Sequence, residues 1–380
     1  MIRELTLYRL ALPLKVPYKL AFGAIDRFDT ILAAARLDAG EGVGEATVLS
    51  GYTDETIEGS WARSKAFAAR LPGLSPEAGK ALAATELANA PFAQTAFVSA
   101  IEMAEDHPLL KITAPTRVDL LVGIEATDEA GIAREIETAL AAGARTLKIK
   151  VGFDADKDLD RVRLIQRLNA GRARLRIDAN QGYDRADALR FARALAPDGI
   201  ELLEQPCAAA DWDSAAEVAK ASAVPLMLDE SIYGEADIER AARIGASFVK
   251  LKLMKLGGIS RLASALDRIG ALGMRAVLGN GVASDIGCWQ EACVARCHVT
   301  TAGEMNGFLR QKQPLATNPM RVEGGAIRLE PEPLRLDFAR VRSFALERCD
   351  FAASPRPGRG ASNAARGDSP ARRARKASVS

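Results

Sequence analysis

The sequence predicts an α/β fold in which a parallel (β/α)8 barrel follows a smaller α+β domain, and three observations support this. Short apolar runs recur along the middle of the chain, and a helical pattern follows each run. Their starts are 23 to 29 residues apart, the length of one strand plus one helix, and fall at residues 117, 146, 175, 199, 225, 248, 275 and 301. Eight such units in series favour a closed barrel over an open sheet. The first strand also lacks the GxGxxG turn of a doubly wound, nucleotide-binding sheet.

The first 112 residues are expected to form the smaller domain. Alternation of apolar and polar residues there predicts three strands, around Glu4–Leu12, Thr30–Leu37 and Gly44–Leu49. Helical patterns follow over Glu55–Arg70 and Pro76–Glu105.

Residues 113–320 are expected to form the barrel. Its strands alternate with amphipathic helices such as Asp154–Asn169, Asp184–Leu195 and Ser260–Leu272. Residues 321–350 contain strand-like pieces, which we expect to return to the N-terminal domain. Residues 351–380 are rich in Pro, Gly, Ser, Ala and Arg, a composition that cannot bury a core, so we expect a disordered basic tail.

The formal net charge of +2 hides an uneven distribution. From Ser354 onward the chain carries seven Arg or Lys and one Asp, so this tail has a charge of +6 and the rest of the chain −4. The body therefore lacks the basic surface typical of nucleic-acid binding. We interpret the tail as a solvated arm without a role in catalysis, with weak binding to an anionic surface as the alternative.

Signals for export or membrane insertion are not evident in the sequence. Charges interrupt the apolar residues of the N-terminus, and no uncharged apolar run reaches about 18 residues. The five cysteines are odd in number and scattered, which indicates reduced thiols rather than a disulfide framework. We therefore expect a cytoplasmic protein without membrane contact, assembled as a homo-oligomer.

Polar residues stand at the carboxyl ends of most of the eight runs, where barrel enzymes place their active sites. Three of them are carboxylates on consecutive strands, Asp178, Glu204 and Asp229, separated by 26 and 25 residues. Neighbouring strands lie about 4.8 Å apart, so these side chains can converge on one ion. Oxygen ligands with open positions are typical of a Mg²⁺ site.

Lysines flank this acidic set. Lys148 and Lys150 are two residues apart on one strand and share a face, whereas Lys252 lies across the barrel. A lysine beside another cation and a metal is expected to lose its proton more readily and to act as a base near neutral pH. Two opposed lysines could supply a base on one face of a substrate and an acid on the other. The alternative interpretation is simple salt bridging to nearby carboxylates.

Five motifs, TLKIKVG, RIDANQ, ELLEQP, LMLDES and KLKLMKLGGI, occur in this order along the chain. With their spacing, the sequence resembles the enolase superfamily, in its muconate-lactonising subgroup. The resemblance covers nearly the whole chain and implies an N-terminal capping domain with lid loops, followed by a modified TIM-type barrel.

The resemblance also implies roles for residues of the motifs. Mg²⁺, for which Mn²⁺ is expected to substitute, would be bound by Asp178, Glu204 and Asp229. Lys150 and Lys252 would be the acid and base, and Lys148 would assist the substrate carboxylate or tune Lys150. Two further residues, Asn180 and Glu230, would contact the ligands rather than the metal. The implied chemistry is removal of the proton beside a substrate carboxylate, with the metal and Lys148 stabilising the charge that develops.

The substrate is expected to be a small carboxylate, but its identity depends on less specific positions. Dipeptide epimerases of this subgroup hold the substrate ammonium with Asp-x-Asp at the eighth strand, where this chain has Glu304-Met305-Asn306. One carboxylate is kept, which still permits a cationic nitrogen near Glu304, and a structural ion pair is the alternative. Further candidate contacts come from the seventh strand and from lid loops at Tyr18–Phe28 and Ser50–Thr53: Asn280, Gly23, Asp26 and Tyr52.

Three functions remain open from the sequence. We favour a racemase or epimerase acting on an amino-acid-derived or dipeptide-like substrate. A cycloisomerase or a β-eliminating dehydratase, of the muconate or hydroxyproline type, would use the same lysines. The third is a non-catalytic carboxylate-binding protein, but no lysine or acid of the motifs is missing. The branch that uses a His–Asp dyad is disfavoured, because the seventh strand, RAVLGNG, contains no histidine.

Overall fold

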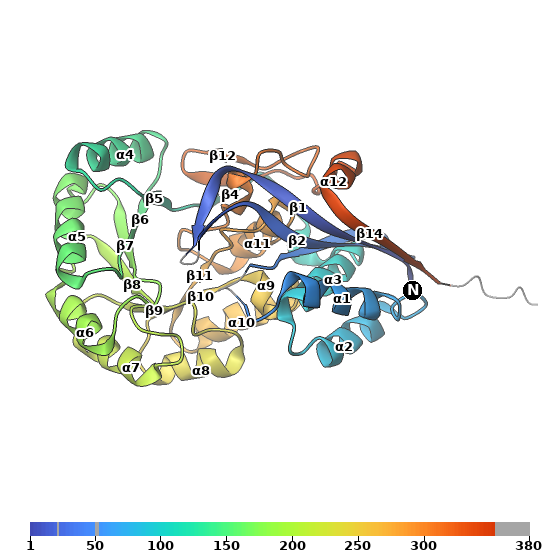
Figure 1. The fold of residues 1–380 in the computed structure, drawn as a ribbon, viewed down its shortest axis with the longest axis horizontal. Helices are drawn as coiled ribbons and strands as arrows, with labels where there is room; N and C mark the ends of the chain where they lie inside the picture. Colours follow the sequence, from blue (N-terminus) through green and yellow to red (C-terminus); the bar gives the residue numbers. More distant parts are fainter. Residues whose placement is uncertain (21–22, 50–52, 354–380) are drawn as a thin grey trace, which may run out of the picture.

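The computed structural model describes residues 1–20, 23–49 and 53–353, which form two lobes (Figure 1). The lobe on the right of Figure 1 is built on an antiparallel sheet with the strand order β14-β1-β2-β3. Its strands are β1 (Ile2–Leu20), β2 (Gly23–Leu37), β3 (Glu41–Thr47) and β14 (Ala345–Ala352). Three helices pack beside this sheet: α1 (Ile57–Ala68), α2 (Pro76–Glu86) and α3 (Pro91–Ala104).

Helix α3 packs directly against β2 and β3. Gly44 permits this close approach, because a Cβ atom there would lie 2.3 Å from the carbonyl oxygen of Ala96. The helical pattern predicted over Pro76–Glu105 is present but is divided between α2 and α3. Pro91 explains the break, because proline starts a helix readily but excludes the residue before it from helical geometry.

The left lobe contains a seven-stranded, curled parallel sheet in the order β11-β10-β9-β8-β7-β6-β5. Its strands are β5 (Val122–Ile124), β6 (Thr146–Lys150), β7 (Arg174–Asp178), β8 (Ile200–Glu204), β9 (Leu226–Leu228), β10 (Phe248–Leu251) and β11 (Arg275–Leu278). Helices lie outside it: α4 (Glu129–Ala141), α5 (Ala155–Asn169), α6 (Arg185–Ala194), α7 (Trp212–Ala221), α8 (Glu235–Arg243), α9 (Leu253–Leu256), α10 (Ile259–Ala271) and α11 (Asp285–His298). In the described part of the chain, no helix is both long and apolar enough to cross a membrane.

Local sequence explains where these helices begin. The side chain before the helix accepts a hydrogen bond from a backbone N–H of the first turn, which satisfies a donor that has no partner within the helix. The capping residues are Asp128, Asp154, Asp184, Asp211 and Ser284.

Residues alternate between the two faces of the sheet. On β6, Leu147 and Ile149 pack into the main hydrophobic core with the surrounding helices. The inward face carries a small apolar cluster of its own, made of Leu202, Met227, Phe248 and Val277. We call this cluster the apolar floor. Glu204, Asp229 and Lys250 each come two residues after one of its members, Leu202, Met227 and Phe248 respectively.

The backbone around Gly303 joins the two edges of the parallel sheet. Gly303 N donates to Asp119 O at 2.8 Å, Leu121 N donates to Gly303 O at 3.0 Å, and Glu304 N donates to Leu278 O at 2.9 Å. The predicted eighth strand over residues 301–307 is therefore reduced to an isolated bridge, followed by the short helix η2 (Gly307–Arg310).

The predicted first barrel strand over residues 117–124 is divided in two. β4 (Thr116–Asp119) pairs with β13 (Ala326–Leu329) in a small antiparallel sheet, and only β5 pairs with β6. The chain passes from one sheet to the other at Leu120, whose N–H donates to Gly325 O. Periodicity could not reveal this change of partner.

The segment after the barrel has two destinations. β12 (Arg321–Glu323) and β13 pair with each other and with β4, so the expectation that residues 321–350 return to the N-terminal domain was wrong for this part. After α12 (Phe338–Phe344), β14 runs antiparallel to β1.

Two buried glutamates connect the lobes, and we call them the interface glutamates. Glu45 on β3 accepts hydrogen bonds from Ser284 N at 2.7 Å and Gly287 N at 3.0 Å, at the start of α11. Glu102 on α3 accepts from Ile259 N at 2.6 Å, at the start of α10. Helix N-termini favour carboxylates, so these contacts fix β3 and α3 of the N-terminal lobe, which we call the capping lobe, relative to the barrel lobe.

Candidate active site

The register of the parallel sheet places the predicted acids side by side. Lys150 is level with Asp178, and Asp178 is level with Glu204. Asp229 directly follows β9, and Lys252 directly follows β10. All five side chains therefore come from the carboxyl ends of five successive strands.

Asp178 and Asp229, which we call the outer acids, each form an ion pair with one of the predicted catalytic lysines. We call these two lysines, Lys150 and Lys252, the outer lysines. Lys150 Nζ lies 2.5 Å from Asp178 Oδ2. Lys252 Nζ lies 2.6 and 2.7 Å from the two oxygens of Asp229. The two lysines thus flank the acidic set from opposite ends, with Glu204 between the two pairs.

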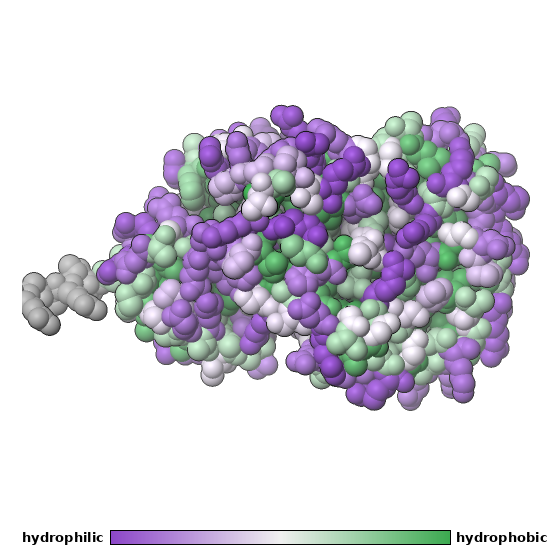
Figure 2. All heavy atoms as spheres, turned by 180° about the vertical axis from the view of Figure 1, so that it is seen from behind, coloured by the Kyte–Doolittle hydropathy of each residue, from purple (hydrophilic) through white to green (hydrophobic). Residues whose placement is uncertain are grey.

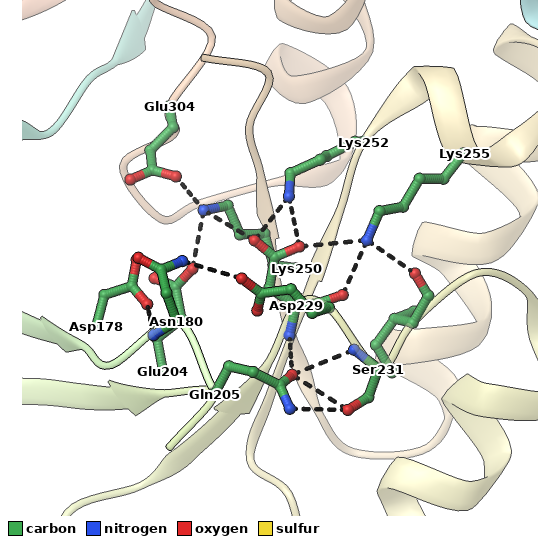
Figure 3. A network of polar contacts seen from close by, with 12 residues as sticks. Asp178, Asn180, Glu204, Gln205, Asp229, Ser231, Lys250, Lys252, Lys255 and Glu304 are labelled. Atoms are coloured by element: carbon green, nitrogen blue, oxygen red, sulfur yellow. Dashed lines mark hydrogen bonds and ion pairs between the residues drawn. The ribbon is translucent and has the colours of Figure 1, made fainter. Parts of the chain in front are cut away.

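Glu204 also belongs to a closed ring of four charged groups of alternating sign, which we call the inner ring: Lys148, Glu204, Lys250 and Glu304. Figure 3 shows Lys250 between Glu204 and Glu304. Lys148 Nζ lies 3.0 Å from Glu204 Oε2 and 2.5 Å from Glu304 Oε1. Lys250 Nζ lies 3.0 Å from Glu204 Oε1 and also contacts Glu304 Oε2. Each glutamate therefore gives one oxygen to each lysine.

Lys148 and Lys250, the inner lysines, also contact the outer acids. Lys148 Nζ lies 2.8 Å from Asp178 Oδ2, and Lys250 Nζ lies 3.4 Å from Asp229 Oδ2. Among the residues that the structure describes, no three Asp, Glu, His or Cys side chains are gathered so that they could hold a metal ion as they stand. Ammonium groups lie between the three predicted ligands.

The sequence model of the Enolase C-terminal domain-like family matches residues 131–333. The chain belongs to the enolase superfamily. Its predicted place in the muconate-lactonising subgroup is also confirmed by the relatives.

Three relatives illustrate this similarity. The L-Lys-D/L-Arg epimerase of Methylococcus capsulatus is 30% identical over 343 residues, which cover 84% of this chain and 94% of that protein. The dipeptide epimerase from Cytophaga hutchinsonii, crystallised with Mg and D-Ala-L-Val, has a TM-score of 0.82 at 20% identity and covers 92% of this chain and all of that one. Muconate lactonizing enzyme from Pseudomonas fluorescens has a TM-score of 0.80 at 26% identity, covering 90% and 99%. The epimerase at 30% identity supports an isomerase with racemase or epimerase function, and the curled sheet is consistent with the (β/α)8 barrel of the two solved structures.

Within this enolase-superfamily site, lysines keep most acids ionised. Burial alone would raise the pKa of Asp178, but Lys148, Lys150 and Lys250 lower it to about 2. The pKa of Glu304 is well below its usual range for a similar reason. Glu204 is different, because burial and the neighbouring Asp178 raise its pKa.

The inner lysines are firmly protonated. Burial would lower the pKa of Lys148, but Asp178, Glu204 and Glu304 raise it above its ordinary value. The pKa of Lys250 is also raised, because Glu204 and Glu304 outweigh burial. Around Lys148 these acids outweigh the effect of the neighbouring Lys250, and the expected effect of a metal on the lysines stays a prediction.

Lys255, one turn after Lys252, was not predicted as a site residue. Burial and the nearby Lys252 lower its pKa to about 8. Its Nζ donates to the backbone carbonyl of Asp229 at 3.0 Å and lies over the ring of Tyr233, 4.4 Å from the centroid. This lysine therefore braces the loop that carries Asp229.

Gln205 was also missed. It has a left-handed backbone, with φ of +36°. Its side-chain oxygen accepts from Asp229 N at 3.0 Å and Ser231 N at 3.2 Å, so it ties the end of β8 to the end of β9. Asn180 and Gln181 have positive φ as well, and such strain often accompanies functional loops. No periodic pattern would have identified Gln205, whereas Lys250 repeats the Lys-x-Lys spacing of Lys148 and Lys150.

Asn180 and Glu230 lie together at the rim of the acidic set. Asn180 Oδ1 accepts from Lys150 Nζ, and Asn180 Nδ2 donates to Glu230 Oε1 at 2.9 Å. Burial and the nearby Asp229 and Asp178 raise the pKa of Glu230 to about 7. Asn180 thus links the outer lysine to a second acid.

The predicted substrate contacts differ in their surroundings. Both oxygens of Glu304 are engaged by the inner lysines, and Asn280 Oδ1 accepts from Ala283 N at 3.1 Å in the turn before α11. Asn306 precedes η2, and Asp26 is exposed on β2. Tyr52 lies outside the described residues, as does most of the second lid loop.

A cavity of about 990 Å³ lies between the two lobes, beside Lys255. Its lining includes Thr53 and Arg63 from the capping lobe and Tyr233 and Arg261 from the barrel lobe. Figure 2 shows a notch between the lobes at the lower edge of the molecule, on a face where polar and apolar residues are mixed. The cavity's lining includes neither Lys150 nor Lys252, so it adjoins the acidic set without containing it.

Proposed function

We propose that this protein is a metal-dependent racemase or epimerase that moves the proton on the carbon beside a substrate carboxylate. Lys150 and Lys252 would serve as the two acid–base groups. One observation carries the proposal: each of these lysines is held by a different outer acid, so they flank Glu204 from opposite ends. We further infer that Gly303 and Glu304 stand in for the eighth strand of the barrel.

The three predicted ligands fit a divalent cation in their chemistry. Asp178, Glu204 and Asp229 are at most 2% exposed, supply only oxygen, and each already faces a cationic group. Binding a hard cation would exchange an ammonium for a metal ion on these oxygens. Mg²⁺ or Mn²⁺ bound there would polarise the substrate carboxylate and disperse the charge that develops as the neighbouring proton leaves.

The roles of the lysines in the reaction follow from their positions. The unprotonated amine of one outer lysine removes the proton, and the ammonium of the other returns a proton to the opposite face. The substrate carboxylate would lie near Lys148, whose raised pKa keeps it cationic and able to stabilise the growing negative charge. Asn180 orients Lys150 by accepting from its Nζ.

For the substrate class, we propose dipeptides and N-acylated amino acids. Dipeptides follow the names of relatives such as the L-Lys-D/L-Arg epimerase and the dipeptide epimerase, and N-acylated amino acids follow the N-succinyl Arg/Lys racemase from Bacillus cereus, a similar structure. Because Glu304 is engaged by two lysines, a substrate without a free ammonium would need no change in the inner ring. N-acyl amino acids therefore deserve equal weight with dipeptides in a screen.

The test is incubation of the Mg²⁺-loaded enzyme with these substrates in D₂O. The proposal predicts one deuterium at the α-carbon and formation of the opposite epimer, without loss of any group, by mass spectrometry and chiral chromatography. Muconates and hydroxyprolines in the same screen test the cycloisomerase and dehydratase alternatives, to which muconate lactonizing enzyme gives support. Ring formation or loss of water, without epimerisation of any amino-acid derivative, would contradict the proposal.

A further inference from the structure

Lys250 is a buried cation to which the proposed reaction gives no task. It is 3% exposed, and it lies two residues along β10 from Phe248 in the apolar floor. Its ammonium cannot turn to water without leaving the inner ring. The Lys250 ammonium therefore stays in contact with at least one acid of the inner ring, also when a metal ion is bound.

The contacts of Lys250 overlap the proposed metal site. Its Nζ lies 3.0 Å from Glu204 Oε1 and 3.4 Å from Asp229 Oδ2, which are two of the three proposed ligands. An ammonium and a divalent ion compete for the same carboxylate lone pairs, and they repel each other at short range. A metal ion on Glu204 and Asp229 would thus require Lys250 to withdraw.

Glu304 can pair with the ammonium of Lys250 when that ammonium leaves Glu204 and Asp229. Its Oε2 contacts Lys250, and its Oε1 lies 2.5 Å from Lys148, which makes matching contacts to Asp178 and Glu204. Glu304 is not one of the proposed ligands. It is therefore a shared counter-ion that can retain both inner ammoniums when the other acids bind a metal.

We propose that Lys250 and Glu304 together set the metal affinity of this site, Lys250 by competing for Glu204 and Asp229 and Glu304 by drawing the ammonium away. The proposal rests on the proposed metal ligands. It gives Glu304 a role as counter-ion rather than as a substrate contact. Both residues are positioning groups, because neither needs to touch the reacting atoms.

The test is titration of the full-length, metal-free protein with Mn²⁺, with free Mn²⁺ measured by electron paramagnetic resonance. Lys250→Met should lower the dissociation constant at least tenfold, because the competing cation is gone. Glu304→Gln should raise it at least tenfold, because Lys250 then has only Glu204 and Asp229 as partners. In the Lys250→Met background, Glu304→Gln should have a smaller effect, since only Lys148 remains to be neutralised.

Matched controls remove the same charges from the surface. Lys220→Met on α7 and Glu323→Gln on β12 are exposed sites and should leave the dissociation constant unchanged. An unchanged or raised dissociation constant in Lys250→Met, with a wild-type circular dichroism spectrum, would overturn the proposal. Should that variant not fold, Lys250→Gln and the single Glu304→Gln variant decide in the same way.

Glu204→Gln separates this proposal from the metal assignment beneath it. Loss of Mn²⁺ binding in Glu204→Gln, combined with no effect of Lys250→Met, would overturn only the competition between Lys250 and the metal. Unaltered Mn²⁺ binding in Glu204→Gln would overturn the proposed ligands and this proposal together.

Discussion

The acidic set at the strand ends and the contact between the lobes both bury carboxylates, but with different partners. At the strand ends, Asp178 and Glu304 face ammonium groups, and their pKa values are lowered. At the contact between the lobes, Glu45 accepts hydrogen bonds from backbone N–H groups and a hydroxyl, and burial, with the nearby Asp285, raises its pKa to about 7. Asp178 and Glu45 are both buried carboxylates, yet their pKa values are shifted in opposite directions.

This difference separates architecture from chemistry. The interface glutamates satisfy helix N-termini and hold the lobes together. Asp178 and Glu304 keep their charge because buried lysines compensate it, whereas burial and Asp178 raise the pKa of Glu204. Such compensated charges are what a site needs to bind a cation or stabilise an anion. Partner type, rather than burial, distinguishes Asp178 and Glu304 from Glu45.

The largest expected effect concerns the outer lysines. Lys150→Ala and Lys252→Ala should each reduce kcat/KM for epimerisation by about 10³-fold or more, because each removes one proton-transfer group. Mn²⁺ binding and the circular dichroism spectrum should remain those of the wild type. Lys220→Ala, an exposed lysine on α7, is the control. Substantial turnover in either outer-lysine variant would contradict the claim that the chemistry takes place at the strand ends through these two lysines.

A matched pair of amide substitutions sharpens the comparison of stability. Asp178→Asn should destabilise the protein by about 3 kcal/mol at pH 7, because it removes a charge partner from the buried Lys148. Glu45→Gln should change stability by less than about 1 kcal/mol at this pH, because its carboxyl is already partly protonated and the amide oxygen can accept the same N–H groups. Urea unfolding of the two variants measures both values, and equal losses would contradict the account.

The pH dependence of stability should differ between the regions. The folded-state pKa of Glu45 is about 7, above its usual value of 4.5, so the stabilisation from its proton is complete below about pH 4.5 and is lost as pH rises through 7. One such group changes the free energy of unfolding by at most about 1.4 kcal/mol per pH unit. Between pH 5 and 8, the free energy of unfolding should therefore change less with pH in Glu45→Gln than in the wild type. A slope unchanged by the substitution would contradict the assigned pKa.

The smallest effect is expected at Asn180. Its φ of +42° is tolerated by glycine, so Asn180→Gly removes the amide without adding strain. We expect about a tenfold decrease in kcat with little change in KM, because Lys150 loses an orienting partner. Asn180→Asp, which keeps the acceptor oxygen, should recover part of the rate. A change confined to KM would instead indicate a direct substrate contact.

Much of the barrel could be predicted from its sequence. The spacing of the apolar runs located the strands of the parallel sheet, and the separations of Asp178, Glu204 and Asp229 placed them on neighbouring strands. These features depend on the period of the chain, which is local information. Family membership followed from motifs that carry the same residues.

The remaining features depend on which groups meet across the fold. Spacing could not show that Glu304 would lie between Lys148 and Lys250, because the ring joins strands far apart in sequence. It also could not show that Gly303 would close the sheet by hydrogen bonds alone, or that β4 would turn to β13. Tertiary partners decide these features.

The most direct measurement of the central claim is deuterium exchange by each lysine variant with each epimer of a substrate, followed by NMR. If Lys150 and Lys252 face opposite sides of one carbon, Lys150→Ala should exchange the α-proton of one epimer only, and Lys252→Ala that of the other epimer only. Exchange of the same epimer by both variants would contradict the account.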